Sequence, residues 1–387
     1  MDSRWELAGL VLIALLAFYG ILNLSIPGLW KFGLCVAEMA LVGQVLIRFF
    51  GMSGEMGLIL LRSKKGLEAI DGLARNEPLW KFFSDTGTTV SYGLLSVFLT
   101  RGNTSWKSVA CGFAIIFLLF FLVGPFVAPF LTEVLKISAV SKAKEQIGIS
   151  SSFEFTLAAV ALLIVGGLFI VLLASLLLYG MVVLSAVAST LLSGTNALAG
   201  TTPGATFLLP GINLPFFEGI AALVIIMVVH EGAHAILGRI ARIPLLSTGI
   251  VLFGVIPIGA FVEPDEAKLN KLERVAQTRV LVAGSTANLV ASIAFFAIFL
   301  LFAILGNAAG VKDIPYVSNL AHSIYLVFGM CFALNFIIGT VNLLPLPFFD
   351  GYRILDVNMK NKYVVNGLAA LTLLAFLANF LPWLFVK

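Results

Sequence analysis

The feature that most constrains this chain is a series of apolar stretches, each about 20 residues long, that recur from one end to the other. Hydrophobic residues make up 60% of the 387 residues and charged residues only 11%, which is more apolar surface than a soluble domain can bury. Inside a bilayer the backbone has no water to bond to, so spanning structures are helices or closed barrels. Because the apolar runs are continuous rather than alternating, the sequence predicts an all-α polytopic membrane protein.

About nine transmembrane helices are expected from the length of these runs. One further apolar stretch, Leu245–Val262, mixes glycines and a proline with Val, Ile and Phe, which favours a short membrane-associated β-hairpin over another span. The predicted spans are Leu7–Leu24, Phe32–Ile47, Thr88–Leu99, Ser108–Phe130, Phe155–Val187, Glu218–Ile240, Arg279–Leu305, Ser323–Leu344 and Val364–Phe385.

The distribution of basic residues predicts how the chain is oriented. With the N-terminus in the cytosol, 19 of the 24 Lys and Arg residues fall in segments on the cytosolic side, as is typical of cytoplasmic loops. This arrangement depends on Thr88–Leu99 crossing the membrane. The basic segment "RSKKGLEAIDGLARNEPLWK" has apolar residues at helical spacing, which fits either a helix on the membrane surface or a solvated loop helix.

Three parts are expected along the chain. Residues 1–190 form an N-terminal membrane domain of about five spans, whose role the sequence does not indicate. Residues 191–217 form a loop rich in Gly, Thr and Pro, and residues 218–387 form a membrane core that carries the chemistry. The three cysteines lie far apart without the spacing of a metal site, so we expect them to pack as inert thiols.

The motif "HEGAH" (230–234) lies in a predicted span and holds two of the three histidines of the chain. Spaced four residues apart on a helix, His230 and His234 project from one face and can bind the same ion. Glu231 is offset from them by about 100° around the axis, near enough to contact a water on that ion. Two neutral imidazoles as ligands with a carboxylate as general base are the arrangement of zinc hydrolases. Since burying such groups in a bilayer is costly unless they are partnered, we predict a site for one Zn²⁺.

A catalytic zinc usually has three protein ligands, so another residue must complete the predicted site. His322 is a poor candidate, because it lies at the outward end of its predicted span, far from the motif. Asp350 is the better candidate, since Pro345 and Pro347 end or unwind the preceding helix and let the chain turn the carboxylate back. Gly351 permits the tight turn that this requires.

Three further residues are candidates for handling a substrate. Asn342 places an amide inside the membrane, where it can donate to a developing oxyanion or hold a substrate carbonyl. An exposed strand accepts an extended peptide by backbone pairing. The predicted hairpin Leu245–Val262, with Gly259 and Phe261 near the expected depth of the site, is the candidate strand; simple packing is the alternative reading of this segment.

These motifs resemble those of the site-2 proteases, a family of intramembrane zinc metalloproteases. "HEGAH" fits the family's HExxH motif, and "NLLPLPFFDG" (342–351) fits its N-x-x-P-x-P-x-x-D-G motif at every specified position. "GSTAN" (284–288) resembles a weaker motif on the intervening helix, with Ser-Thr where Gly-Pro is commoner, and by this resemblance Asn288 is expected to bind substrate. "PIGAFVEPDE" (257–266) resembles the stretch that follows the first motif in some members. The N-terminal spans are only loosely similar to archaeal members with extra helices.

The resemblance implies a role for each matched residue. His230, His234 and Asp350 are expected to bind one zinc ion, and Glu231 is expected to activate a zinc-bound water for peptide-bond hydrolysis. Asn342 is expected to assist at the oxyanion or in substrate binding. The expected enzyme is therefore a zinc metalloendopeptidase.

The resemblance also implies a biological setting. The expected substrates are single-span or few-span membrane proteins, cut in or near their transmembrane helices in regulated intramembrane proteolysis. The site would lie in the cytosolic half of a prokaryotic, archaeal-like plasma membrane. Many bacterial members insert a PDZ domain and some archaeal members append a cytosolic regulatory domain; we expect neither here, because residues 263–279 form too short a segment and the chain ends just after its last helix. Besides substrates and the lipid bilayer we expect no nucleic-acid partner, and the sequence leaves the oligomeric state open.

Two other classes of protein remain as alternatives. Prenyl-protein-processing proteases also use HExxH but take a glutamate as third ligand, and no acid lies in a predicted span between Arg279 and Asp350. A transporter or channel with a mid-membrane His/Glu ion site would need acids or polar breaks in several helices. Glu38 and Gln44 are the clear candidates for such groups.

Overall fold

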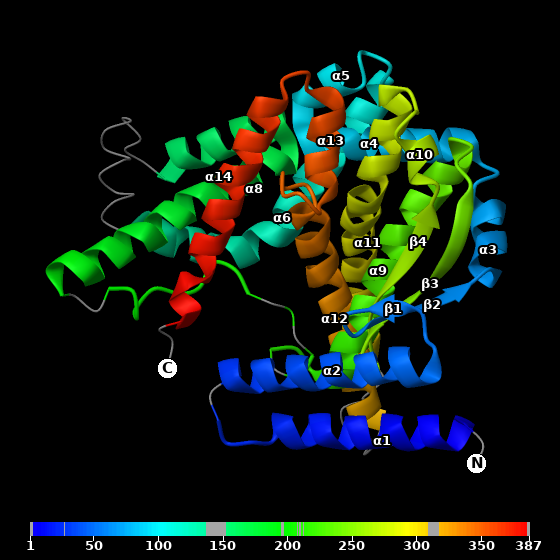
Figure 1. Cartoon of the computed structure of the whole chain (residues 1–387). Coiled ribbons are helices and arrows are strands. Elements are labelled where there is room, and N and C mark those ends of the chain that lie inside the picture. Colours follow the sequence, from blue (N-terminus) through cyan, green and yellow to red (C-terminus); the bar gives the residue numbers. More distant parts are fainter. Residues whose placement is uncertain are drawn as a thin grey trace. The chain divides into compact units, whose positions relative to one another are not determined.

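The computed structural model describes residues 3–26, 28–136, 152–194, 197–206, 208, 210, 211, 213–308 and 317–384 (Figure 1). The helices are α1 (Ser3–Leu22), α2 (Gly28–Phe50), α3 (Lys65–Leu73), α4 (Glu77–Tyr92), η1 (Gly93–Leu95), α5 (Ser96–Leu99), α6 (Trp106–Lys136), α8 (Ser152–Ser193), α9 (Phe216–Ile240), α10 (Glu266–Leu269), α11 (Arg274–Ala308), α12 (Val317–Val341), α13 (Asp350–Asn358), α14 (Lys362–Phe380) and η3 (Leu381–Leu384). The strands are β1 (Gly54–Glu55), β2 (Leu58–Ser63), β3 (Leu245–Phe253) and β4 (Ile256–Pro264).

The prediction of a helical, polytopic membrane protein is confirmed. Among the described residues, 7 helices are long and apolar enough to cross a membrane, and the apolar part of α6, Trp106–Leu122, is shorter. The expected total of about nine spans stays a prediction. The spanning segments are Trp5–Leu22, Trp30–Phe50, Leu157–Ser193, Phe216–Ile240, Arg274–Ala308, Val317–Val341 and Lys362–Trp383.

The predicted span Thr88–Leu99 is wrong as a single helix. It consists of the end of α4, the 3₁₀ turn η1 and the short helix α5. The break comes at Gly93, whose φ of 55° is left-handed backbone that favours glycine. A Cβ on Gly93 would lie only 2.3 Å from the carbonyl oxygen of Ile164 in α8, so the close approach of α8 also requires glycine here.

The predicted hairpin at Leu245–Val262 is confirmed and belongs to a four-stranded antiparallel sheet in the order β1-β2-β3-β4. β4 is therefore an edge strand, and its prolines, Pro257 and Pro264, are residues that sheets tolerate at an edge. Figure 1 shows β3 and β4 as two long neighbouring arrows, with α9 packed along β4. The N-terminal strand β2 covers the other edge of β3 over the register Leu58↔Phe253 to Ser63↔Thr248.

The chain divides into two compact units that are each discontinuous in sequence. One comprises Met1–Arg75, Leu208–Leu269 and Ala294–Asn335, and the other comprises Asn76–Phe207, Asn270–Ile293 and Phe336–Lys387. The domain boundaries expected from the sequence, 1–190, 191–217 and 218–387, stay a prediction.

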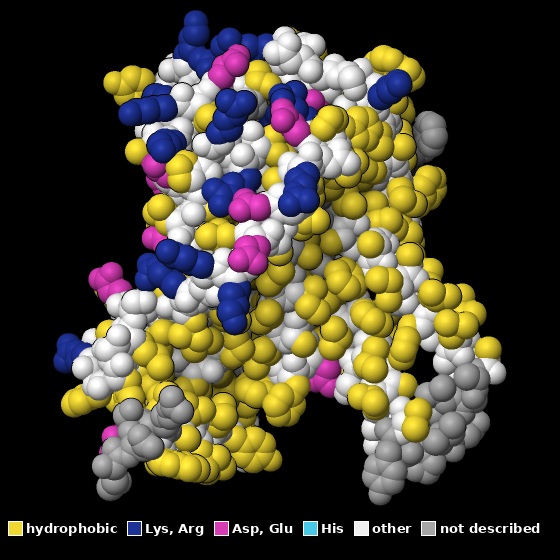
Figure 2. Space-filling view, turned by 90° about the vertical axis from the view of Figure 1, so that its right-hand side faces the viewer, with side chains coloured by type: hydrophobic (Ala, Val, Ile, Leu, Met, Phe, Trp, Pro, Cys, Tyr) yellow, Lys and Arg dark blue, Asp and Glu magenta, His cyan; other side chains and the backbone are white. Residues whose placement is uncertain are grey.

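The first unit holds the sheet against α2, α3 and α9. The turn at Gly57 packs so closely on Ala40 of α2 that a Cβ there would come within 2.7 Å of the Ala40 Cα. The basic segment after β2 forms α3, which packs on α9 and β3 and has Ile70 as its buried residue. Figure 2 shows basic and acidic side chains close together on the face that carries α3 and the sheet. Two ion pairs join these elements to each other or to α9: Arg62 pairs with Glu263, and Arg239 pairs with Asp71.

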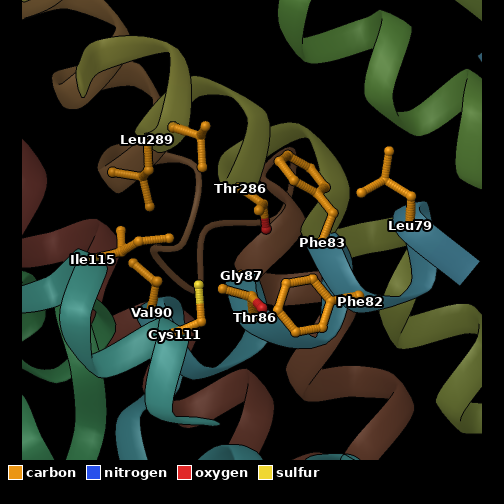
Figure 3. A pocket seen from close by; sticks show the side chains of 11 residues that line it. Leu79, Phe82, Phe83, Thr86, Gly87, Val90, Cys111, Ile115, Thr286 and Leu289 are labelled. Atoms are coloured by element: carbon orange, nitrogen blue, oxygen red, sulfur yellow. The ribbon is translucent and has the colours of Figure 1, made fainter. Parts of the chain in front are cut away.

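The second unit is built around α4, which packs against α6 and α8. Every residue from Ser84 to Tyr92 is buried. Gly87 faces α11 so closely that an added Cβ would overlap the Thr286 side chain. An apolar cavity of about 190 Å³ lies beside this contact, with Cys111 of α6 reaching in opposite Thr286 and Leu289 of α11 (Figure 3).

Candidate metal centre

The two histidines of "HEGAH" lie on one face of α9, as their spacing predicts. Their Nε2 atoms are 3.2 Å apart, and the ring centroids are 4.8 Å apart at an interplanar angle of 75°. His230 is buried, with 4% of its surface exposed, and His234 is half-buried. The start of this helix is tied to α12, because the Ser323 hydroxyl donates to the Glu218 carboxylate over 2.6 Å.

This geometry fits a shared metal ion. Two nitrogens that each bind zinc at about 2.05 Å with a tetrahedral angle lie roughly 3.3 Å from each other. The observed separation of 3.2 Å matches that spacing. Imidazole nitrogens are also ligands that Zn²⁺ prefers, so the pair is suited to this ion in both chemistry and geometry.

The loop before α13 presents Asp350 as the first residue of that helix. The Gly351 N–H donates to the Asn342 carbonyl over 2.8 Å, which closes the loop that contains Pro345 and Pro347. A Cβ on Gly351 would lie 1.9 Å from the carbonyl oxygen of Leu343. The "DG" pair is therefore required by the turn itself, and the prolines prevent α12 from continuing through it.

The structure brings Asp350 together with the two histidines. One ligand atom from each of His230, His234 and Asp350 can be chosen so that all lie within 4.8 Å of one another. Among the described residues, these are the three that form a group able to hold a metal ion. Their role as zinc ligands stays a prediction. His322 is exposed near the start of α12 and is not part of this group.

Glu231 follows His230 on α9 and is half-buried. Its neighbour Gly232 has open space where a side chain would lie, so this stretch of the helix is not closely covered. The predicted role of Glu231 as general base stays a prediction.

The two asparagines predicted to act on the substrate differ in their surroundings. Asn342 is half-buried, and its backbone carbonyl supports the Asp350 loop. Asn288 is fully buried in α11. It packs so closely on Gly339 of α12 that a Cβ added to this glycine would lie 2.9 Å from the Asn288 Cβ. This contact gives Asn288 a packing role, and both substrate roles stay predictions.

Gly259 and Phe261 both lie on β4, next to the metal-site helix. A Cβ on Gly259 would touch the Met227 side chain at 3.4 Å, and Met227 lies one turn before His230 on α9. The Phe261 ring covers Gly249, its partner on β3. The strand thus runs alongside the turn of α9 that precedes the histidines, and its predicted role in substrate binding stays a prediction.

The sequence reasoning missed the N-terminal hairpin that completes the sheet. Met56 and Gly57 both have positive φ, of 51° and 84°, which is the backbone of a two-residue hairpin turn. The signal for it is the glycine in "GEMGLILL", directly before a β-prone run.

Comparison with known proteins finds a family match that includes this site. Residues 218–378 match the family model described as Peptidase family M50. An uncharacterized protein of Methanocaldococcus jannaschii is 36% identical over 100 residues, which is 26% of this chain. The chain spans 27% of the length of that relative. No solved structure matches the chain.

Proposed function

We propose that this integral membrane protein is a zinc endopeptidase that cuts other membrane proteins in or near their transmembrane helices, because residues 218–378 match the model of peptidase family M50, the site-2 protease family. At the level of the family, the chain is a membrane metalloprotease. The observation that carries the finer proposal is the approach of the His230, His234 and Asp350 ligand atoms to within 4.8 Å of one another.

In this proposal His230, His234 and Asp350 hold a single Zn²⁺. Two imidazoles and one carboxylate leave a fourth position open, as a catalytic zinc site requires. When bound, zinc polarises the scissile carbonyl and makes water a better nucleophile near pH 7. The prenyl-protein-processing alternative requires a glutamate as third ligand, and the third residue of the described group is Asp350.

Glu231 is the residue we propose to move the proton. Its carboxylate accepts a proton from the attacking water and delivers it to the nitrogen of the leaving amine, so that one water and one peptide bond give a carboxylic acid and an amine. The half-buried position of Glu231 and the open space at Gly232 support access for water and substrate. Asn342 would assist by donating to the oxygen on which charge develops.

The substrate we propose is an unwound segment of a transmembrane helix, paired with the edge of β4. β2 covers the outer edge of β3, so among the described strands β4 is the long one that lies at an edge of the sheet. β4 also packs along α9, and Gly259 lies beside the turn before His230. Backbone pairing there would place an extended peptide next to the histidines, with Phe261 as a further contact.

The setting of the reaction is also part of the proposal. The Lys and Arg residues in 239–244, 263–279 and 349–363 support an active site on the cytosolic side of a prokaryotic, archaeal-like membrane. A cytosolic N-terminus is proposed with it, and requires in addition that the chain crosses the membrane between residues 88 and 99. Single-span and few-span membrane proteins are the proposed partners.

Coexpression with a single-span reporter tests the proposal. Wild-type protein should cleave the reporter, and Glu231→Gln should lower cleavage by about 10²–10⁴-fold while keeping the zinc, because the amide cannot accept the proton. Glu273→Gln, the same change at an exposed position, is the matched control and should cleave as wild type does. Normal cleavage by Glu231→Gln would show that another group is the base. A wild type that neither binds zinc nor cleaves would favour the transporter or channel reading.

A further inference from the structure

The short helix α13 begins with Asp350 and ends with Asn358, so the third proposed metal ligand and Asn358 lie at opposite ends of 9 residues. A helix of this length spans about 13 Å and moves largely as a unit, because its hydrogen bonds join each turn to the next. A displacement at one end of α13 is therefore passed to the other. What holds Asn358 bears directly on where the Asp350 carboxylate lies.

The two ends of α13 are held in different ways. The beginning is held by its own loop, where the Gly351 N–H donates to the Asn342 carbonyl over 2.8 Å. At the end, the side-chain amide of Asn358 donates to the Thr278 hydroxyl of α11 over 2.9 Å. It also donates to the Ile354 carbonyl, one turn earlier in α13, over 2.9 Å. The bond to Thr278 is the one that joins α13 to another helix.

Thr278 is a well-fixed anchor on α11, with only 1% of its surface exposed. The next residue, Arg279, is held by α4. Its guanidinium donates to the Asp85 carboxylate over 2.7 and 2.8 Å, and its backbone carbonyl accepts from the Ser84 hydroxyl over 2.9 Å. All these residues belong to the same compact unit as α13. The bond from Asn358 thus reaches a point on α11 that a third helix holds in place.

The buried side chains of α13 hold it less sharply than this bond does. Ile354 and Leu355 belong to the same apolar cluster as Leu281 and Val282 of α11. The burial of apolar side chains is non-directional, so it keeps α13 in the cluster but tolerates a small slide or rotation. A hydrogen bond depends on distance and angle, so the bond from Asn358 fixes the place of α13 along α11.

We infer that Asn358 is a positioning residue for Asp350, acting through α13 and its hydrogen bond to Thr278. This inference rests on the proposed function, because it concerns the placement of a proposed zinc ligand. A metal site needs its ligands held to within about 0.5 Å, and groups behind the ligands commonly supply that precision. Since α4 lies outside the matched range 218–378 and holds the residue next to Thr278, the N-terminal half contributes to the site in this way.

Zinc affinity of the full-length protein in detergent, measured by competition with a chelator, tests the inference. Asn358→Leu keeps a side chain of similar size without the amide, and Thr278→Val removes the hydroxyl that accepts from it. Each variant should weaken zinc binding about 2–10-fold, because the effect cannot exceed the net contribution of one hydrogen bond. The double variant should lose no more than either single variant, since both changes break the same contact.

Two matched controls separate positioning from a merely structural role. Thr278→Ser retains a hydroxyl and should bind zinc as tightly as wild type. Asn366→Leu makes the same substitution on α14, where the exposed Asn366 side chain accepts from the Tyr352 hydroxyl of α13 over 3.1 Å. This variant should also keep the wild-type zinc affinity, because the bond between α13 and α11 is intact. If Asn358 served only its own helix through the Ile354 carbonyl, Thr278→Val would have no effect.

Different outcomes separate this inference from the proposed function. Wild-type zinc affinity in Thr278→Val would overturn the inference alone, as would additive losses in the double variant. An equal loss in Thr278→Ser or in Asn366→Leu would also overturn it, because neither change breaks the contact between Asn358 and the anchor hydroxyl. A wild-type protein that binds no zinc would overturn the proposed function and the inference with it.

Discussion

The helices α4 and α9 both place polar side chains among apolar neighbours, but two threonines of α4 and two histidines of α9 have different kinds of partner. On α4, the hydroxyls of Thr88 and Thr89 donate to backbone carbonyls one turn earlier in the same helix. On α9, the rings of His230 and His234 instead face each other at a distance suited to one shared ion. The comparison teaches that polar content inside a bundle does not by itself mark a reactive site. What marks it is the convergence of several side chains able to bind one metal ion.

The charged groups of the two helices differ in the same way. Asp85 on α4 is paired with Arg279 on α11 through two hydrogen bonds of 2.7 and 2.8 Å, which makes it a complete structural pair. Glu231 on α9 is half-buried beside the proposed metal ligands. We therefore expect a substitution of Asp85 to lower the stability of the fold, and a substitution of Glu231 to lower the rate of cleavage.

Removing one member of the α4 pair should have the largest effect on stability. Asp85→Ala leaves the largely buried Arg279 guanidinium without its partner and should lower the free energy of unfolding by about 3–5 kcal/mol. Replacing both residues, in Asp85→Leu with Arg279→Met, should recover most of the loss. Thermal unfolding in detergent measures both variants. If Asp85→Ala unfolded at the wild-type temperature, the structural reading of the α4 pair would be wrong.

A smaller effect, confined to the metal site, should follow from changing the turn that presents Asp350. An added Cβ in Gly351→Ala meets the Leu343 carbonyl, so the turn must shift, and zinc affinity should fall by about tenfold, the lower end for disturbed ligand support. Gly232→Ala is the matched control, since it places a methyl in open space within "HEGAH". Competition with a chelator measures the zinc affinity of both variants. Equal zinc affinities for the two variants would contradict the role given to this turn.

The smallest effect is expected at the surface of the sheet. Donation from Ser247, and then from Arg62, holds the pKa of the Glu263 carboxyl below its usual value. A lowered pKa contributes stability above the unfolded pKa of about 4.3, and this contribution is lost as the pH falls through the folded value. Since the Glu263 side chain is 39% exposed, we expect less than about 1 kcal/mol.

Ser247→Ala and the control Thr248→Val test this expectation by thermal unfolding across pH 3–7. The Ser247 hydroxyl donates to the Glu263 carboxylate, whereas the Thr248 hydroxyl donates to the Ser63 carbonyl, which does not titrate. Ser247→Ala should unfold at a lower temperature than wild type, and this difference should shrink at low pH. The corresponding difference for Thr248→Val should not change with pH. A deficit of Ser247→Ala that did not change with pH would show that the carboxylate plays no part.

Local patterns were sufficient to predict much of the fold and the local geometry at the candidate site. Continuous apolar runs predicted the spanning helices, and the four-residue spacing of His230 and His234 predicted their common face. The prolines before Asp350 predicted the turn that presents it. Each of these features depends on residues close in sequence.

The features that were missed depend on residues far apart in sequence. Thr88–Leu99 reads as apolar, but the break at Gly93 is set by the approach of α8. The pairing of Arg62 with Gly249 joins strands from opposite halves of the chain.

The metal content of purified protein tests the central claim most directly. The account predicts about one zinc per wild-type chain, and a large loss in both His234→Ala and Asp350→Asn, because each removes one of three ligands. An Asp350→Asn protein that retained zinc as wild type does would contradict the claim that one carboxylate and two imidazoles share the ion.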